Sequence, residues 1–164
     1  MVQSALSVEP ARPEDYERIA ELTVGVYVDG RLASGGYTPQ LADVAGRASR
    51  SELLVVRDAR GGIVGSVALV LTGDFGEVTT SDEEAAFRML VVDQAARGQG
   101  VGQLLVRTCL DRARAAGKRR MVISTDPRMT SAHRLYERLG FGRLPERDWS
   151  PMAGTDLLVY SREL

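Results

Sequence analysis

A short run of glycine and polar residues could bind an anion through the protein backbone. The run consists of Arg97, Gly98, Gln99, Gly100, Val101 and Gly102. A residue without a Cβ lets a negatively charged group approach the backbone N–H groups closely. The Arg97 guanidinium and the Gln99 amide could add further hydrogen-bond donors. The chemistry that these residue types indicate is recognition of a phosphate.

The elements on either side of this run would aim its N–H groups at a ligand. Phe87–Val92 is an apolar run with the length and β-branched content of a buried strand. From Val101 the apolar spacing becomes helical and continues to Ala116, and Gly117 is a typical stop. The first N–H groups of a helix have no internal partner and carry partial positive charge, which favours phosphate. The same glycines would also suit a tight turn with close helix packing and no ligand.

Two familiar nucleotide-binding loops do not fit this spacing. The dinucleotide pattern G-x-G-x-x-G needs a glycine where Gln103 stands, and the pattern G-x-x-x-x-G-K-[ST] needs a Lys-Ser or Lys-Thr that does not follow. What remains is R-x-x-G-x-G, formed by Arg97, Gly100 and Gly102. A phosphate-binding regulator that responds to nucleotides is therefore a weakened alternative.

A second pattern, A-x-x-L-Y-x-x-x-G-F, runs from Ala132 to Phe141. Its apolar spacing predicts a helix over Ser131–Leu139 that ends at Gly140. The two patterns occur in this order, with a helix and a predicted strand, Arg120–Ser124, between them. In both motifs and in their order, the chain resembles the GNAT superfamily, the GCN5-related N-acetyltransferases.

This resemblance implies an α/β (α+β) fold with a central mixed, mostly antiparallel sheet flanked by helices. It also implies that two parallel strands splay apart and that acetyl-CoA, the co-substrate, wedges between them. Pantetheine would then bond to backbone groups of Leu90, Val91 and Val92. The pyrophosphate would lie on the amides of Arg97, Gly98, Gln99, Gly100, Val101 and Gly102. From the element order itself, Phe87–Val92 and Arg120–Ser124 should be parallel, because a helical crossover joins them.

Tyr136 matches the usual tyrosine of the family. A phenol can donate a hydrogen bond to the departing CoA sulfur and act as general acid, whereas a tyrosine on an apolar helix face is otherwise most often a core residue. Direct attack of a neutral amine on the thioester needs no metal, and we expect none. The Leu90 amide is the best candidate donor to the oxyanion.

The general base is less evident, because the family's usual glutamate position holds Ala86. Glu84 lies two residues earlier on the same face of the strand and could act through water, with Glu83, Asp82 and Glu77 as weaker candidates. These acidic residues could equally form a solvated loop. If they face the acceptor, a cationic amine would be favoured on approach.

The other elements are expected at the following ranges: strands Ala5–Glu9, Leu53–Arg57, Ile63–Leu71, Arg143–Glu146 and Leu157–Arg162, a helix from Pro13, a loop over Gly30–Gly36, a second helix over Thr38–Ala45, and a polar connection over Gly73–Glu84. We expect the acceptor pocket to be formed by the first two helices with their loop, by this connection and by a loop around Trp149. Tyr27, Tyr37 and Trp149 could be its walls.

Composition limits the class of protein. The chain has 164 residues, which suggests one domain over residues 1–164. A formal net charge of −1 argues against non-specific nucleic-acid binding. No segment approaches a membrane span or a signal peptide. The single cysteine, Cys109, lies on the apolar stripe of its helix and is expected to be buried. A cytoplasmic location is the default.

The sequence therefore predicts an acyl-CoA-dependent N-acetyltransferase that acts on a small-molecule amine or an exposed protein amine. The alternative is a non-catalytic acyl-CoA-binding module, which the missing glutamate at position 86 keeps open. By analogy with family members, a homodimer is among the expected states.

Overall fold

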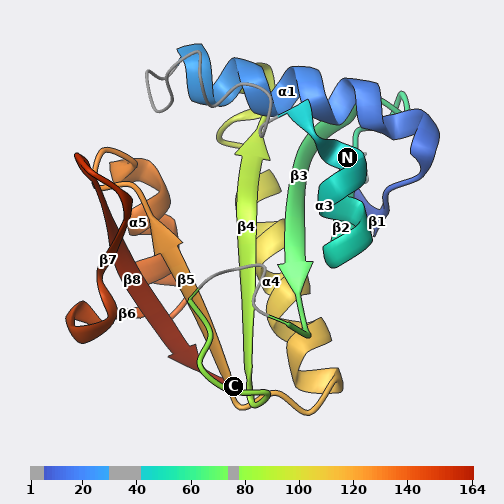
Figure 1. Ribbon diagram of the computed structural model, residues 1–164. Coiled ribbons are helices and arrows are strands. Elements are labelled where there is room, and N and C mark those ends of the chain that lie inside the picture. The colour runs from blue at the N-terminus through green and yellow to red at the C-terminus, as the bar shows by residue number, and fades with distance from the viewer. Residues whose placement is uncertain (1–5, 30–41, 74–77) are drawn as a thin grey trace. The chain divides into compact units, whose positions relative to one another are not determined.

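The computed structural model of the protein describes residues 6–29, 42–73 and 78–164 (Figure 1). The chain forms two compact units. The first takes in the chain up to Ala68 together with Met89–Thr108, and the second consists of Leu69–Arg88 and Cys109–Leu164. Each unit is thus built from stretches that are separated in the sequence.

The first unit contains helices and strands from both of its stretches. Its N-terminal stretch holds β1 (Ser7–Pro10), the 3-10 turn η1 (Pro13–Asp15), α1 (Tyr16–Asp29), α3 (Val44–Arg50), β2 (Glu52–Arg57) and most of β3 (Ile63–Val70). The second stretch adds the end of β4 (Glu84–Val92), the 3-10 turn η3 (Gln94–Ala96) and the first half of α4 (Val101–Ala115). β1 and β2 are antiparallel, with Ser7 opposite Arg57.

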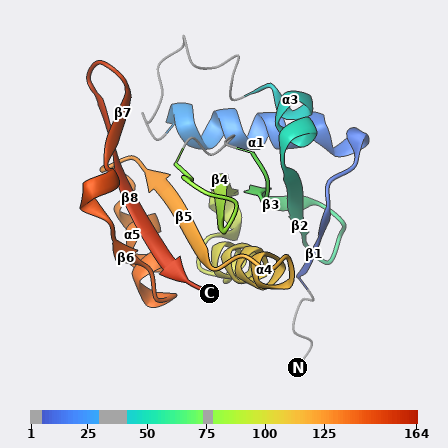
Figure 2. The same cartoon turned by 60° about the horizontal axis from the view of Figure 1, so that its bottom comes forward.

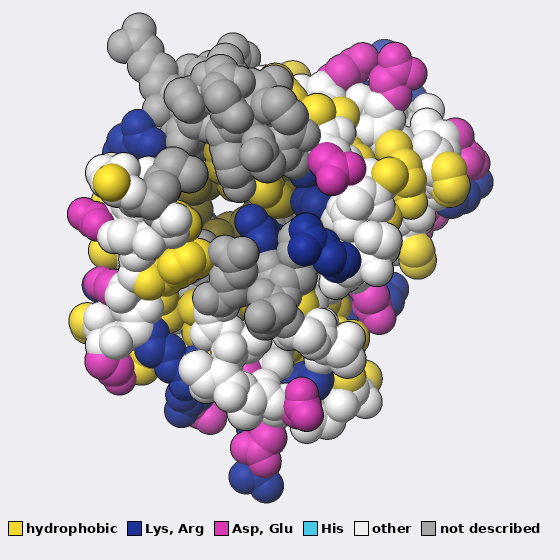
Figure 3. Space-filling view, in the orientation of Figure 1, with side chains coloured by type: hydrophobic (Ala, Val, Ile, Leu, Met, Phe, Trp, Pro, Cys, Tyr) yellow, Lys and Arg dark blue, Asp and Glu magenta, His cyan; other side chains and the backbone are white. Residues whose placement is uncertain are grey.

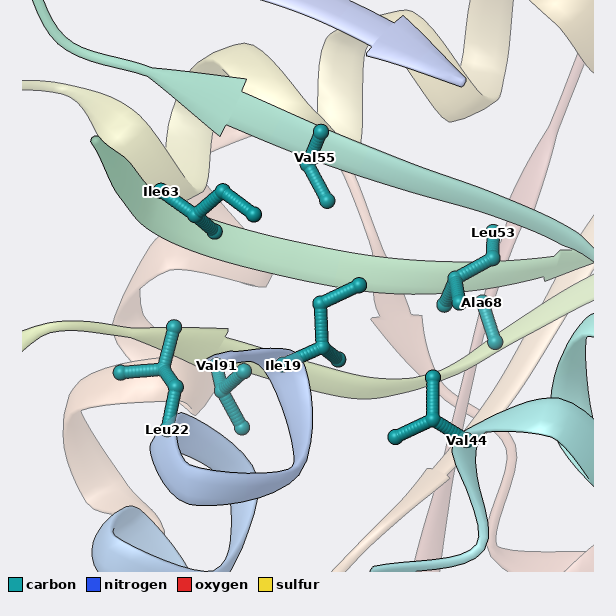
Figure 4. Close-up of a cluster of buried hydrophobic side chains, with 8 residues drawn as sticks. All are labelled: Ile19, Leu22, Val44, Leu53, Val55, Ile63, Ala68 and Val91. Atoms are coloured by element: carbon teal, nitrogen blue, oxygen red, sulfur yellow. The ribbon is translucent and has the colours of Figure 1, made fainter. Parts of the chain in front are cut away.

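The core of the first unit lies between its helices and its strands. It consists of Ile19, Leu22, Val44, Leu53, Val55, Ile63, Ala68 and Val91. Figure 4 shows Ile19 and Leu22 of α1 and Val44 of α3 pointing toward the strand residues. Each large aliphatic side chain buried in this way contributes about 1.5–3 kcal/mol relative to an exposed one. This packing holds the end of β4 in place through Val91.

The second unit is organised around its C-terminal strand. After α4 the chain forms β5 (Arg120–Thr125), α5 (Thr130–Arg138), β6 (Gly142–Arg143), the 3-10 turn η4 (Pro145–Arg147), β7 (Trp149–Met152) and β8 (Thr155–Glu163). β8 is antiparallel to β5, β6 and β7, and Figure 2 shows it beside β5. β4 is parallel to β5, with Glu84 opposite Arg120 and Ala85 opposite Met121. The core here includes Val70, Val78, Ala86, Val122 and Val159.

In hydrogen-bonded order the strands are β1-β2-β3-β4-β5-β8-β6, and β7 pairs with β8. The sheet is mixed, because one parallel pair stands beside antiparallel ones. This confirms the predicted fold class and the parallel pairing of the two strands that α4 connects.

Most predicted elements are confirmed to within three residues. Gly117 and Gly140 follow α4 and α5 with φ of 80° and 88°, values that favour glycine and that end a helix. The hairpin between β2 and β3 closes where Gly61 has φ 82° and Asp58 N donates to Gly62 O at 2.9 Å. Cys109 is fully buried, as expected.

Three expectations about element boundaries were wrong. The helix expected over Thr38–Ala45 is not continuous: its part before Ala42 lies outside the described residues, and Asp43 is not helical. A separate helix, α3, runs from Val44 to Arg50, because Asp43 caps it by accepting from Gly46 N at 3.0 Å. The region around Trp149 is strand β7 rather than a loop, since it pairs with β8. The strand expected over Arg143–Glu146 is only two residues long, because Pro145 has no N–H to donate and begins a 3-10 turn.

Glu84 is a fourth correction. It is buried and is the first residue of β4, whereas the strand was expected to begin at Phe87 and the polar connection to end at Glu84. Two other expectations, the loop over Gly30–Gly36 and the helix start at Thr38 and Pro39, lie outside the described residues.

The surface carries charges of both signs. Figure 3 shows Lys and Arg side chains interspersed with Asp and Glu on the face that it presents. Within the ranges that the structure describes, every helix is too short or too polar to span a bilayer.

Candidate functional site

The end of β4 leads directly into the glycine-containing run identified from the sequence. Val91 is buried in the core of the first unit, and Leu90 and Val92 are half-buried. Their side chains therefore take part in packing. The groups of these residues that a ligand could bind are the backbone N–H and C=O groups. A role of this backbone in binding stays a prediction.

Met89 is a feature that sequence reasoning missed. Its φ is 55°, in the left-handed region that residues other than glycine rarely adopt. Such a conformation costs of order 1–3 kcal/mol and is concentrated at functional sites. It turns the backbone of β4 immediately before Leu90, the candidate oxyanion donor. Nothing in the sequence signals it, since methionine has no preference for this conformation.

Beyond β4, the loop presents a row of unpartnered backbone donors. The first bond of α4 runs from Leu104 N to the Gly100 carbonyl at 2.9 Å. The N–H groups from Gly98 to Gln103 therefore have no acceptor among the described residues. Gly98 and Gly100 have φ of 80° and 82°, and the run from Arg97 to Gly100 is exposed. This is the geometry of an anion site at a helix N-terminus.

A close contact between β3 and the first turn of α4 requires a glycine in the strand. A Cβ on Gly65 would lie 2.6 Å from Val101 Cγ1 and 3.3 Å from the Val91 carbonyl oxygen. Glycine at this position is therefore what allows the first turn of α4 to pack against the strand.

An ion pair holds the turn between β4 and the loop. Asp93 caps η3 by accepting from Ala95 N at 3.0 Å, and its other oxygen accepts from Arg18 of α1 at 2.7 Å. Asp93 N in turn donates to the Val64 carbonyl of β3 at 2.8 Å. The loop thus starts from a fixed point in the first unit.

Tyr136 belongs to an aromatic cluster of the second unit. It lies in α5, is 4% exposed, and has Phe87 of β4 at a ring-centroid distance of 5.9 Å. Phe141 and Tyr160 pack against the same ring at 5.7 and 6.0 Å. Phe141 N also donates to the Tyr136 carbonyl at 2.9 Å, which closes the helix as the second motif predicts. The ring of Tyr136 is therefore held from several sides.

Glu84 is the centre of an ion-pair network. Its Oε1 accepts from Thr80 N at 2.8 Å, from Thr80 Oγ1 at 3.2 Å and from Arg147 Nη1 at 2.9 Å. Its Oε2 lies 3.7 Å from Arg120 Nη1. Burial by itself would raise the pKa of this carboxyl, but the bonds from Arg147 and Thr80 outweigh it and leave the pKa below its ordinary value. Glu84 is therefore ionised at neutral pH and is a weak base.

Ala86, at the family's usual base position, is fully buried in the core of the second unit. It lies on the same face of β4 as Glu84, as the alternation predicts. Among the weaker candidates, Asp82 and Glu83 are exposed, with Glu83 paired to Arg119 at 3.7 Å. Glu77 lies outside the described residues.

A pocket of about 240 Å³ opens in the second unit beside this network. Its lining residues are Val78, Thr79, Thr80, Arg147 and Trp149. Val78 and Trp149 pack in the same cluster as Ala86. Trp149 is thus a pocket wall, whereas Tyr27 packs against the core of the first unit and Tyr37 lies outside the described residues.

The predicted site residues therefore fall into two groups. Leu90, Val91, Val92 and the run from Arg97 to Gly102 form one continuous strand, loop and helix start in the first unit. Tyr136 and Glu84 belong to the second unit, together with the pocket.

Comparisons with known proteins bear on the family and the fold of the chain. The sequence profile of the Acetyltransferase (GNAT) family matches residues 13–141. Among curated proteins, none matches the chain significantly in sequence.

Solved structures give many matches over nearly the whole chain. A GCN5-related N-acetyltransferase from Kribbella flavida is 28% identical with a TM-score of 0.74, and the match covers 98% of each chain. A GNAT-family acetyltransferase from Staphylococcus aureus Mu50 is 17% identical with a TM-score of 0.76, covering 98% of this chain and 99% of the other. The protein yncA of Salmonella typhimurium, solved with its cofactor acetyl-CoA, is 22% identical with a TM-score of 0.71, covering 98% and 94%. The profile match over most of the chain, with both motifs built as the sequence predicts, means that this chain belongs to the GNAT family of acetyltransferases.

Proposed function

We propose that the protein is an N-acetyltransferase that moves an acetyl group from acetyl-CoA to a primary amine, on a small molecule or on a protein. The observation that carries this proposal is the row of backbone N–H groups from Gly98 to Gln103, without acceptors among the described residues and placed at the start of α4. A pyrophosphate is the ligand that such a row suits best. The similar yncA structure, which holds acetyl-CoA, supports the choice of co-substrate.

In the reaction, the neutral amine attacks the thioester carbonyl carbon, the C–N bond forms and the C–S bond breaks. The Leu90 amide donates to the carbonyl oxygen as negative charge develops there. Tyr136 gives its proton to the departing thiolate, and the amine proton passes to water. Binding both reactants in one place supplies much of the acceleration.

Glu84 is the proposed base that takes the amine proton transiently, through that water, and releases it to solvent. Because its pKa is below the ordinary value, it stays ionised across the usual assay range. The pH dependence of kcat/KM should therefore follow the ionisation of the amine itself, rising with pH until the amine is neutral. A rise centred near pH 6–7 would instead indicate a different base.

Calorimetric titration with acetyl-CoA, with ATP and NAD as controls, tests the co-substrate. Gly100→Glu should abolish binding, since a carboxylate would repel the pyrophosphate. Gly61→Glu is the matched control, because Gly61 has the same φ of 82° as Gly100 and open space around its Cα, in the hairpin between β2 and β3. Release of CoA thiol with a panel of amines then tests transfer.

Either of two results would refute parts of the proposal. If acetyl-CoA does not bind to folded protein that carries no co-purified CoA, the loop is only a turn. If it binds but no amine is acetylated, the protein is a non-catalytic acyl-CoA-binding module.

A further inference from the structure

The charged side chain that the described residues place in the lining of the second unit's pocket is an arginine. As far as the described residues form it, Arg147 is the charged residue in its lining, and Thr79, Thr80, Val78 and Trp149 complete it. Of the acidic residues expected to favour a cationic amine, Asp82 and Glu83 are among the described residues. Asp82 and Glu83 are exposed outside the lining.

The guanidinium of Arg147 is held in a defined orientation. Nη1 donates to Glu84 Oε1 at 2.9 Å and Nη2 donates to Thr80 Oγ1 at 3.1 Å, while the side chain remains 24% exposed. Its Nε–H has no acceptor among the described residues. A guanidinium that is already oriented loses little entropy when it binds a further oxygen.

Glu84 is bonded to Nη1 of Arg147, so it leaves the Nε–H edge of that guanidinium without a carboxylate partner among the described residues. Glu84 faces Arg120 at 3.7 Å as well as Arg147, so two guanidinium groups approach one carboxylate. Arg120 Nε also pairs with Glu163 Oε1 at 2.7 Å, and Arg120 is not one of the lining residues. Arg147 is therefore the cation that a ligand in the pocket meets.

Trp149 adds a second donor without a partner in the described part of the chain. Its Nε1 is buried and forms no hydrogen bond with any described residue. A buried donor left without an acceptor costs about 1–3 kcal/mol. An oxygen atom of a bound ligand, placed against this nitrogen, would remove that cost. The indole and Val78 would at the same time cover an apolar part of the ligand.

We propose that this pocket binds a carboxylate of the acetyl acceptor, so that the acceptor is an α-amino acid or a similar amine with an anionic group and an apolar side chain. Arg147 and Trp149 would donate to the carboxylate oxygens. The pocket lies against the cluster that contains Ala86, the position where the family usually carries its base, and it is therefore suited to hold an acceptor. This inference rests on the proposed function and specifies its substrate class.

Matched pairs of acceptors test the inference. Phenylalanine is compared with 2-phenylethylamine, and methionine with 3-(methylthio)propylamine, at saturating acetyl-CoA and with kcat/KM corrected for the neutral amine fraction. The wild-type protein should prefer the amino acid of at least one pair by about tenfold or more. Equal rates within both pairs, or preference for the amines, would overturn the inference.

Three variants show whether the preference comes from this pocket. Arg147→Gln should lower kcat/KM for the amino acid by more than it lowers kcat/KM for the paired amine, so that the preference is lost. Arg120→Gln is the matched control, because it also takes an arginine from Glu84 but lies outside the lining, and it should keep the preference. Trp149→Phe keeps an aromatic ring but removes the indole N–H together with part of the ring system, so it should reduce the preference even if Arg147→Gln does not fold. Preference retained in both pocket variants contradicts the inference.

Failure of the proposed function is distinguishable from failure of this inference. If acetyl-CoA binds but no amine is acetylated, the same pairs are titrated calorimetrically into protein saturated with CoA. Tighter binding of the amino acid, lost in Trp149→Phe, supports carboxylate recognition without turnover. Binding of neither member, or tighter binding of the amine, overturns it.

Discussion

The hydroxyl of Tyr136 is carried by a ring with very little freedom to move. Phe87, Phe141 and Tyr160 pack around it at centroid distances of 5.7–6.0 Å, in tilted or edge-on arrangements. Such contacts add about 0.5–1.5 kcal/mol each beyond the area that they bury. A ring held in this way can present its oxygen in one direction, which a general acid requires.

Tyr136→Phe should lower kcat by about 100-fold, since the proton donor to the thiolate is lost. The dissociation constant of acetyl-CoA, measured by calorimetry, should change by less than about twofold, since a phenyl ring preserves the packing. Tyr160→Phe removes a hydroxyl from the same aromatic cluster and should keep kcat. An unchanged kcat in Tyr136→Phe would show that this tyrosine is only a core residue.

Asp15 makes the stability of the first unit depend on pH. It is 6% exposed and accepts from Arg57 Nη2 at 2.7 Å and from Arg12 N at 2.8 Å, while Arg57 also pairs with Glu9. The bond from Arg57 lowers the pKa of Asp15 below its ordinary value of 3.8, although burial acts in the opposite direction. Its contribution to stability is therefore complete above that ordinary value and is lost as the pH falls through the lowered pKa.

Asp15→Asn should reduce the free energy of unfolding by about 2 kcal/mol at pH 7, the worth of a hydrogen bond to a charged group. Urea titrations from pH 7 to pH 2 should show this difference shrinking as the carboxyl of the wild-type protein becomes protonated. Glu14→Gln is the control, because Glu14 is exposed and pairs with Arg12 only at 3.6 Å. A difference that stays constant with pH would mean that the charge of Asp15 does not stabilise the folded protein.

At the level of elements, the loop between β4 and α4 is positioned by contacts at its two ends. Asp93 ties the start of the loop to Arg18 of α1 and to the Val64 carbonyl of β3. Gly65 lets the first turn of α4 approach β3 closely. The unpartnered N–H groups between these points are thus oriented by neighbouring elements, in addition to the glycines of the loop itself.

Gly65→Ala should lower the free energy of unfolding by about 1–3 kcal/mol, the usual cost of overpacking, because the new methyl group would lie 2.6 Å from Val101 Cγ1. The affinity for acetyl-CoA should fall as well, since α4 must move at its N-terminus. Thermal unfolding and calorimetry measure the two effects. Gly142→Ala, in β6 with nothing within 4 Å of the added carbon, should change neither quantity. If Gly65→Ala binds acetyl-CoA with wild-type affinity, the position of the α4 N-terminus does not determine binding.

On the scale of the whole molecule, the two units are connected through shared elements. β3, β4 and α4 each pass from one unit into the other, with the changes after Ala68, Arg88 and Thr108. A strand or helix that loses its packing in one unit therefore loses part of its support in the other. This connectivity favours cooperative unfolding of the two units together.

Urea unfolding followed by Trp149 fluorescence, which reports the second unit, should coincide with unfolding followed by far-UV circular dichroism. Asp15→Asn, a change confined to the first unit, should shift the Trp149 transition by the same amount as the circular dichroism transition. A Trp149 midpoint that does not respond to this variant would mean that the units unfold separately. The prediction of a single domain would then be wrong.

The features that the sequence by itself determined are those that depend on residues close together in the chain. Alternation and helical periodicity located β4, α4, β5 and α5, because burial of one face imposes a period on neighbouring residues. Gly117 and Gly140 marked helix ends, since the left-handed backbone required there favours glycine. The two motifs identified the family for the same reason, as each is a short stretch within one local structure.

Only the tertiary structure decided the features that depend on distant contacts. Arg147, 63 residues from Glu84, lowers the pKa of that carboxyl and brings a cation into the pocket. Trp149 lies in a strand because β8 offers it a partner, and Met89 adopts a positive φ that no local preference predicts. The local pattern of a side chain limits which element it can join, but its neighbours across the fold set its charge state, its burial and the ligand that it can meet.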